Sequence, residues 1–179
     1  SIASTLNNIG DIYYEQSNYN KALEYLFQSL KIKEEINDKR LMASSYHNIA
    51  NVYLDMKIFD LAKEYELNCI SLRTALEEFW ELGISYNTLG LIYSDEKSYD
   101  RAITEFNQAI KCSVNEGDSI NIAKVYSSLS QAYFGKGNYP LSENYELRAI
   151  AIQQAHDDFK GLGVSYNHLG NIYLEQDNS

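Results

Sequence analysis

Residues 86–93 read Tyr-Asn-Thr-Leu-Gly-Leu-Ile-Tyr, and residues 166–173 read Tyr-Asn-His-Leu-Gly-Asn-Ile-Tyr. Related stretches with the same placement of large and small residues occupy 46–53 and 126–133, so the pattern returns at a constant interval without a gap. A period between about 20 and 50 residues indicates a solenoid, because each repeat is too small to bury its own apolar face and must stack on its neighbours. We therefore look for function on a surface that several repeats share.

The whole chain follows this period. It divides into repeats 1 to 4 and the beginning of repeat 5, at residues 1–40, 41–80, 81–120, 121–160 and 161–179. Both ends fall inside the pattern, since Ile2-Ala3-Ser4 corresponds to Met42-Ala43-Ser44 and residues 175–179 correspond to a turn within a repeat. We expect one array that is a fragment of a longer protein.

Each repeat has the pattern of two helices. In repeat 1, apolar residues recur three and four apart at Ile2, Leu6, Ile9 and Tyr13, which predicts a helix over about 2–16. Ser17-Asn18 interrupts the pattern with short polar side chains that favour a turn and cap a following helix. A second apolar series then continues to about residues 37–38, and no stretch alternates as a strand would. The prediction is an all-α array of helix-turn-helix repeats.

Charge and composition narrow the range of partners. The chain has 15 lysines and arginines against 25 aspartates and glutamates, for a net charge of -10. Nucleic acids and acidic membrane surfaces attract concentrated positive charge, so neither is an expected partner. No apolar run approaches the roughly 18 residues that span a bilayer. Cys69 and Cys112 occupy small or aliphatic positions of the pattern, which indicates packed thiols in a reducing, cytoplasmic compartment.

Residues suited to catalysis or cofactor binding do not gather along the sequence. His47, His156 and His168 lie in separate repeats, and none has a carboxylate or cysteine at metal-ligand spacing. The glycines form no phosphate-binding loop followed by Lys-Ser or Lys-Thr. No base, nucleophile and orienting group occur together. We expect no catalytic residue, no metal, no cofactor and no enzymatic activity.

The repeat resembles that of the tetratricopeptide repeat family. The residues that carry the resemblance are clearest in repeat 3: Tyr86, Leu89-Gly90, Tyr93, Ala102, Phe106 and Ala109. The resemblance extends over all 179 residues, although the repeat is longer, at about 40 residues where the family has about 34. It implies a right-handed α-α superhelix whose first helices line a concave groove, and a scaffold that binds a protein or a peptide there without catalysing a reaction.

A polar stripe on the first helices is the candidate peptide-binding surface. If residues 2, 6, 9 and 13 face the core, a helical wheel places 7 and 11 on the opposite side. The row at position 7 has Asn7, His47, Asn87, Ser127 and Asn167, and the row at position 11 has Asp11, Asn51, Leu91, Gln131 and Asn171. A carboxamide offers both a donor and an acceptor, so such rows can hold the backbone of an extended peptide. The alternative is that these amides bond between helices.

An acidic row is a second candidate feature. Glu15, Asp55, Asp95 and Glu175 share one position of the repeat, which Gly135 interrupts. As an acidic rim of the groove, this row favours a partner with lysine or arginine and steers it at low salt. The alternative is a row of solvated helix ends.

The pattern leaves two functions open. One is a recognition module that holds a peptide or protein segment. The other is a sensory segment of a bacterial signalling protein, in which a bound peptide changes the superhelix and drives an attached kinase, phosphatase-like or DNA-binding domain. Self-association is a further expectation, since repeat 5 has no second helix and Leu169 and Tyr173 would lack part of their packing.

Overall fold

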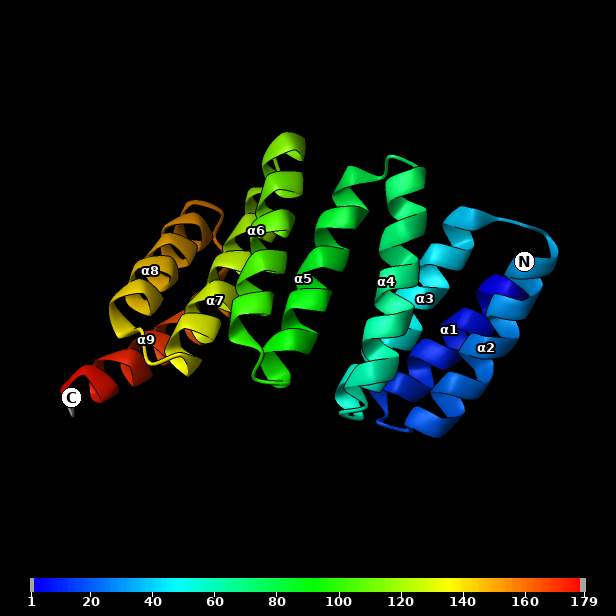
Figure 1. Ribbon diagram of the computed structural model, residues 1–179, viewed down its shortest axis with the longest axis horizontal. Coiled ribbons are helices and arrows are strands. Elements are labelled where there is room, and N and C mark those ends of the chain that lie inside the picture. Colours follow the sequence, from blue (N-terminus) through cyan, green and yellow to red (C-terminus); the bar gives the residue numbers. More distant parts are fainter. Residues whose placement is uncertain (1, 178–179) are drawn as a thin grey trace.

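The computed structural model describes residues 2–177, apart from the side chains of residues 115 and 116. Within this part, the helices are α1 (Ile2–Glu15), α2 (Tyr19–Glu35), α3 (Lys39–Asp55), α4 (Phe59–Ala75), α5 (Phe79–Asp95), α6 (Tyr99–Glu116), α7 (Ser119–Gly135), α8 (Tyr139–Ala155) and α9 (Phe159–Asp177). Consecutive helices pack as hairpins, and the hairpins stack in one row from the N-terminus to the C-terminus (Figure 1). The predicted all-α superhelix is confirmed.

The turns are more regular than the sequence. A residue with a left-handed backbone, φ between 54° and 73°, recurs at every half repeat, at Ser17, Asn37, Lys57, Glu77, Lys97, Gly117, Gly137 and Asp157. The next residue donates its N–H to a carbonyl five positions back, as Asn18 does to Tyr13 at 2.8 Å. This arrangement is the Schellman motif, which satisfies the last carbonyls of a helix. The backbone geometry therefore repeats with every helix and turn, whereas the pattern of side chains repeats with every second helix.

Short polar side chains cap five of the described helices with a hydrogen bond. The side chains of Asn18, Asp38, Asp118, Asn138 and Asp158 each accept a hydrogen bond from the backbone N–H three positions on. Such a cap stabilises a helix by about 1 kcal/mol. The predicted capping role of Ser17-Asn18 is thus confirmed for Asn18. At these five turns, one left-handed residue is followed directly by the cap of the next helix.

The core depends on small residues in the first helix facing large residues in the second. In repeat 3, a Cβ atom placed on Gly90 would lie 2.4 Å from the ring of Phe106, so only glycine fits beneath this fully buried side chain. In repeat 1, a Cβ atom on Gly10 would lie 2.9 Å from Leu26. At the corresponding second-helix positions, repeats 2 and 4 bury the glutamates Glu66 and Glu146. The same backbone thus packs either an apolar or an ionisable group.

The buried stripe of the first helices is rotated from the predicted one. Ile2 is 75% exposed, while Ser45 and Val52 are fully buried and Tyr53 is half-buried. The reason is that α3, α5 and α7 each pack against their own second helix and also against the preceding hairpin, whereas α1, which carries Ile2, contacts α2 and α3. The tyrosines on the flank instead stack on second-helix rings, as Tyr53 does on Tyr65 with centroids 5.7 Å apart.

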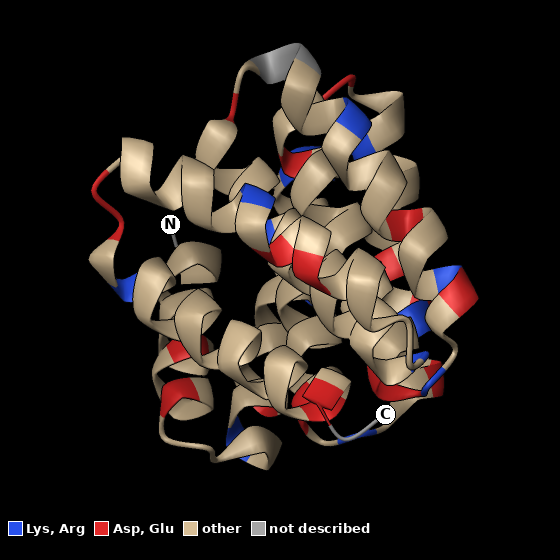
Figure 2. Cartoon of the chain, turned by 90° about the vertical axis from the view of Figure 1, so that its left-hand side faces the viewer, with Lys and Arg blue, Asp and Glu red and all other residues tan. Residues whose placement is uncertain are grey.

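Charged side chains are mixed over the surface. In Figure 2, lysines and arginines are scattered among aspartates and glutamates, with no block of basic residues on the face drawn. Several ion pairs join one repeat to the next, including those of Arg40 with Glu78 and Lys136 with Asp100. Among the described helices, none combines the length and the apolar character that crossing a membrane requires.

Candidate functional site

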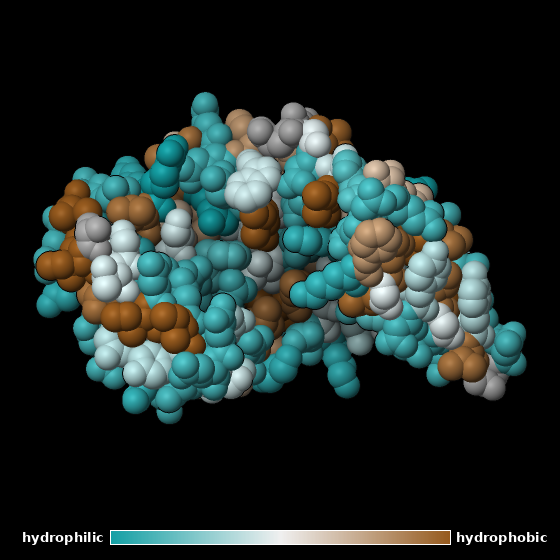
Figure 3. Space-filling view, turned by 180° about the vertical axis from the view of Figure 1, so that it is seen from behind, coloured by the Kyte–Doolittle hydropathy of each residue, from teal (hydrophilic) through white to brown (hydrophobic). Residues whose placement is uncertain are grey.

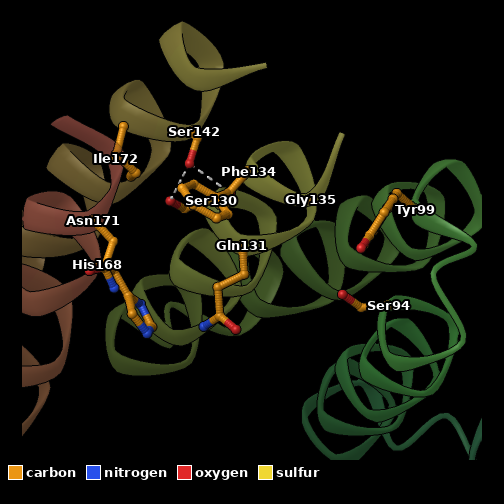
Figure 4. A pocket seen from close by; sticks show the side chains of 10 residues that line it. All are labelled: Ser94, Tyr99, Ser130, Gln131, Phe134, Gly135, Ser142, His168, Asn171 and Ile172. Atoms are coloured by element: carbon orange, nitrogen blue, oxygen red, sulfur yellow. Dashed lines mark hydrogen bonds between the residues drawn. The ribbon is translucent and has the colours of Figure 1, made fainter. Parts of the chain in front are cut away.

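Two adjoining cavities form a groove between α7 and α9. The first, of about 290 Å³, is lined by Ser94, Tyr99, Gln131, Phe134, His168 and Asn171 among others (Figure 4). The second, of about 600 Å³, is lined by Lys124, Ser127, Gln131, Gln153, Lys160 and Ser165 among others. The two cavities adjoin at Gln131, which borders both, and we name them together the α7/α9 groove.

The helical period of α7 explains why its polar side chains meet in the groove. Residues 124, 127, 128, 131 and 135 follow one another at helical spacing, so they form one stripe of the helix. The facing residues of α9 follow the same spacing from 161 through 164, 165 and 168 to 172. First helices therefore supply most of the lining residues, to which α6 and α8 add Tyr99, Ser142 and Gln153.

Unpartnered polar atoms lie beneath the α7/α9 groove. Glu146 of α8 is fully buried, and its Oε1 atom accepts a hydrogen bond from Ser127 at 3.0 Å. Its Oε2 atom has no hydrogen-bond partner among the described residues; Nδ1 of His168 lies 3.9 Å away, beyond hydrogen-bond distance, and also has no described partner. The Oε1 atom of Gln153, a residue 5% exposed, also lacks a described partner. A buried acceptor without a donor costs about 1–3 kcal/mol, so each calls for an explanation.

Three of the predicted peptide-binding amides are free. Gln131, Asn167 and Asn171 are exposed, and none makes a hydrogen bond with another described residue. In Figure 4, Gln131 lies between His168 on α9 and Ser94 on α5. Gln131 and Asn171 border the α7/α9 groove, whereas Asn167 is absent from its lining. The structure thus brings together two residues of the predicted ladder.

In repeat 1 the predicted amides are occupied by neighbouring helices. Asn7 donates to Asp11 at 2.9 Å and accepts from the buried Lys33 at 3.2 Å, and Asn48 of α3 donates to Asp11 at 3.1 Å. Burial raises the pKa of Asp11 and lowers that of Lys33. For Asn7 and Asp11, the alternative interpretation, bonding between helices, describes the arrangement.

Repeat 2 contains a polar cluster that spacing along the sequence did not suggest. His47 on α3 lies with its Nδ1 atom 3.1 Å from both carboxylate oxygens of the buried Glu66 on α4. Asn51 lies with its Nδ2 atom 3.1 Å from the other ring nitrogen, Nε2. Cys69, one turn beyond Glu66, is also buried, and burial raises the pKa of its thiol to about 12. His47 therefore has the carboxylate and cysteine neighbours that the sequence analysis did not find for it.

A signal for this cluster was present in the repeat. The position of Glu66 is apolar in Leu26 and Phe106, and the position of Cys69 is Ala109 in repeat 3. Repeat 2 departs from these neighbours with ionisable side chains at positions that face the same first helix. Comparing departures between repeats would have connected His47 with these two residues of the following helix.

The remaining amide-row residues have different environments. Leu91 is partly buried and packs against the core of repeats 3 and 4. Asn87 is half-buried, and its Oδ1 atom has no partner in the described part of the chain. Neither residue lines the α7/α9 groove.

Part of the acidic rim binds neighbouring repeats. Asp55 accepts a hydrogen bond from Tyr14 at 2.8 Å, and Asp95 forms an ion pair with Lys57. Burial and the Asp55 carboxylate together raise the pKa of Tyr14. Glu15 is exposed and borders another cavity, of about 310 Å³, between α1 and α3. These contacts connect successive repeats and reduce the charge left for a partner.

The apolar side chains of repeat 5 are covered to different extents. Leu169 is only 9% exposed, so α7 and α8 already provide most of its packing, contrary to the expectation for this residue. Tyr173 is 42% exposed and donates to Glu143 of α8 at 3.0 Å. On the face drawn in Figure 3, apolar residues form separate patches among hydrophilic ones. That face therefore presents no single continuous apolar surface.

Helical hairpins stacked in a row, with a groove lined by their first helices, define an α-solenoid. The chain belongs to the tetratricopeptide repeat family, whose profile, described as Tetratricopeptide repeat, matches residues 1–75 and 81–155. The family predicted from Tyr86, Gly90 and the related residues is thereby confirmed. A search of proteins with curated functions found no match.

Several solved structures share the fold at low sequence identity. Aspartyl phosphate phosphatase F from Bacillus subtilis superposes with a TM-score of 0.88 at 18% identity, over 98% of this chain and 48% of that one. A Rap protein complexed with competence and sporulation factor gives 0.84 at 19% identity, over 97% and 48%. BtubC from P. vanneervenii gives 0.85 at 18% identity, over 97% and 72%. The chain thus spans about half the length of the first two proteins.

Proposed function

We propose that this chain is a recognition module that binds an extended peptide, or an extended segment of another protein, in the α7/α9 groove. The observation that carries the proposal is the combination of free amides at the rim of the groove with unpartnered buried acceptors below it. Elsewhere on the first helices, the corresponding groups of Asn7 and Asp11 already bond to other helices. A ligand in the α7/α9 groove would therefore gain hydrogen bonds without displacing existing ones.

The peptide backbone is the part of the ligand that the rim fits. Gln131 on α7 and Asn171 on α9 lie on neighbouring first helices that border the same cavity. Each carboxamide offers a donor and an acceptor, the combination that pairs with one peptide group. Such contacts are independent of the ligand's side chains, so specificity has to come from deeper in the groove.

A basic group is the side chain that the floor fits. Gln153 borders the second cavity with an unpartnered oxygen, whereas Glu146 lines neither cavity and lies behind Ser127, a lining residue that donates to its fully buried carboxyl group. A lysine, an arginine or the amino terminus of a peptide supplies several N–H donors and the matching charge. The net charge of -10 would assist the approach of this ligand at low salt, although Lys124 and Lys160 line the second cavity.

A second candidate is a sensory role in a signalling protein. A similar structure from Pyrococcus horikoshii is described as a signal transduction ATPase with a tetratricopeptide repeat sensor, with a TM-score of 0.85 and 19% identity over 27% of that protein. The Rap protein was solved with competence and sporulation factor bound. In this role, ligand binding between α7 and α9 would change the angle between neighbouring repeats in a cytoplasmic regulator.

Selection from a random peptide display library tests the proposal. The wild-type chain is compared with a Gln131→Ala, Asn171→Ala variant, and Asn7→Ala serves as the matched control because Asn7 lies outside the groove. We expect the wild type and the control to enrich one motif that contains lysine or arginine, and the groove variant to lose it. Equal enrichment by the groove variant would exclude the α7/α9 groove as the peptide site.

The basic preference and the assembly state have separate tests. Glu146→Gln keeps the size of this buried residue but replaces its carboxyl group with an amide, so we expect it to weaken binding of the enriched peptide and to favour neutral residues in a repeated selection. An unchanged motif would contradict the role of Glu146.

For self-association through repeat 5, sedimentation velocity should show a mass that rises with concentration, and a constant monomer mass would exclude it.

A further inference from the structure

Three potential metal ligands converge in repeat 2, away from the α7/α9 groove. The donor atoms of His47, Glu66 and Cys69 all lie within 4.8 Å of one another. Glu66 and Cys69 are separated by about one turn of α4, which places them on one face of that helix, and His47 faces them from α3. Two helices of one hairpin thus present a nitrogen, an oxygen and a sulfur ligand to the same space.

The other repeats show that the fold does not require these residues. At the three positions, repeat 1 has Asn7, Leu26 and Ser29, repeat 3 has Asn87, Phe106 and Ala109, and repeat 4 has Ser127, Glu146 and Ala149. Repeat 2 is the one with a ligating side chain at all three positions. Packing accounts for an amide, an apolar residue and a small residue here, whereas a shared ligand accounts for the joint change to histidine, glutamate and cysteine.

The neighbours of the cluster are suited to support a metal ion. Asn51 contacts Nε2 of His47 at 3.1 Å, and such a partner on the second ring nitrogen orients a histidine ligand. Arg73 donates to Ser85 at 2.6 Å, and the Ser85 hydroxyl lies 3.2 Å from the sulfur of Cys69. Arg73 and Ser85 thus extend the polar surroundings of the cluster on the side of the sulfur.

Access is possible from the side of the histidine. The side chain of His47 is 16% exposed, while that of Glu66 is fully buried. Three protein ligands leave one position of a tetrahedral ion for water, and the exposed edge of His47 is where that water would lie. The cluster therefore has the ligand number, the support and the entry path of a metal site.

We propose that His47, Glu66 and Cys69 bind one divalent transition-metal ion, with Zn²⁺ as the best fit to this nitrogen, oxygen and sulfur set. On binding, the S–H bond of Cys69 breaks, an S–Zn bond forms and the proton passes to the buffer. The proton that Nδ1 of His47 shares with the Glu66 carboxylate moves to Nε2, which frees the lone pair of Nδ1 to bind the metal. Asn51 then turns its amide so that Oδ1 accepts from Nε2.

The test measures metal binding directly. Zn²⁺ is titrated into the chain in competition with a chromogenic chelator, and Co²⁺ is used in parallel to detect the thiolate-to-metal charge-transfer band. We expect one saturable site per chain, a charge-transfer band with Co²⁺ and a higher thermal midpoint with Zn²⁺. The test variant combines His47→Asn with Cys69→Ala, which installs residues that repeat 3 already has at these positions. We expect its affinity to fall by at least about 100-fold and the band to disappear.

Matched controls separate this site from adventitious binding. Cys112→Ala and His168→Asn remove a thiol and an imidazole elsewhere and should leave stoichiometry, band and affinity unchanged. Glu66→Gln should weaken Zn²⁺ binding but keep the band, since the thiolate remains. Absence of a saturable site in the wild type, or equal affinity in the double variant, would overturn the inference. Because peptide selection involves α7 and α9, its failure would leave this result unaffected, and the reverse also holds.

Discussion

Repeats 2 and 4 differ from repeats 1 and 3 at one buried position of the second helix. Leu26 and Phe106 fill this position with apolar side chains, and each lies directly against a glycine of the first helix. Glu66 and Glu146 bury a carboxyl group there instead, one contacting His47 and the other retaining an unpartnered oxygen. Both candidate ligand sites, the metal cluster and the floor of the groove, lie in the repeats with glutamate. The two proposed sites thus lie where the repeat departs from its apolar form.

The largest effect on stability is expected in a repeat with an apolar side chain at this buried position. Gly90→Ala should lower the free energy of unfolding by about 2–3 kcal/mol, because the new methyl group overlaps the ring of Phe106. Gly170 occupies the same position in repeat 5 with no atom within 4 Å, so Gly170→Ala should raise it by about 0.5–1 kcal/mol through helix propensity. Urea unfolding of both variants measures the difference. A loss below about 0.5 kcal/mol for Gly90→Ala would mean that the Phe106 contact is easily relieved.

The two glutamates themselves provide the next test. Glu146→Leu should raise the free energy of unfolding by about 1–2 kcal/mol, because it removes a buried carboxyl group with an unpartnered oxygen. Glu66→Leu should lower it by about 1 kcal/mol, because His47 loses its acceptor. Thermal unfolding in the presence of a chelator compares them. Changes of the same sign would show that the His47 contact does not distinguish the two repeats.

Repeat 3 lacks a ring pair that the other complete repeats have. Tyr13 with Tyr25, Tyr53 with Tyr65 and Tyr133 with Tyr145 are stacked, with centroids 5.5–5.7 Å apart. Glu105 occupies the corresponding position opposite Tyr93. Glu105→Tyr should raise the free energy of unfolding by about 1 kcal/mol by completing the fourth pair. A chemical denaturation experiment at pH 7 would show no gain if Tyr93 cannot take up the stacked geometry.

The same glutamate predicts a pH dependence. Burial raises the pKa of Glu105 above its ordinary value of 4.5, so the folded chain binds this proton more tightly than the unfolded chain. Stability from this group is therefore present below pH 4.5 and lost as the pH rises through the raised pKa. Glu105→Gln should be more stable than the wild type at pH 7 and equal to it at pH 4. A difference that grows toward acid would contradict this direction.

The smallest effects are expected in the turns, which the two forms of repeat share. Lys97 has a left-handed backbone at φ 63°, a conformation that costs a side chain about 1 kcal/mol, so Lys97→Gly should stabilise by about 0.5 kcal/mol. Gly137, at φ 73°, meets no atom within 4 Å, and Gly137→Ala should destabilise by a similar or slightly larger amount. Opposite signs in calorimetry would confirm that strain alone acts here.

The fold was largely predictable because its determinants are local. Apolar spacing and short polar residues located the hairpins, and the first helix ends at Glu15 where about residue 16 was expected. The rotation of the buried stripe was not predictable from one helix, since it depends on the preceding hairpin. Tyr53 illustrates this, because its ring is placed by Tyr65 on another helix.

The candidate site was predictable only in part. The row at position 11 identified Gln131 and Asn171. The sequence did not distinguish them from other residues of the rows at positions 7 and 11, which have different hydrogen-bond partners in the structure. Asn7 bonds to Lys33 on the following helix, and no pattern within a single helix reveals that contact. The floor residues Glu146 and Gln153 were missed because they belong to the second helices.

The even spacing of the turns sets the steps by which such an array can change length. Inserting or deleting one whole repeat would keep every helix in its role and extend or shorten the groove by one position. Removing half a repeat, for example 97–116, would rejoin matching turn geometries at Lys97 and Gly117, so the backbone would close without strain. Every later helix would then take the other position in its hairpin, so that second-helix sequences would face the groove. The backbone geometry is therefore compatible with the loss or gain of half a repeat, whereas the side chains require the loss or gain of a whole repeat.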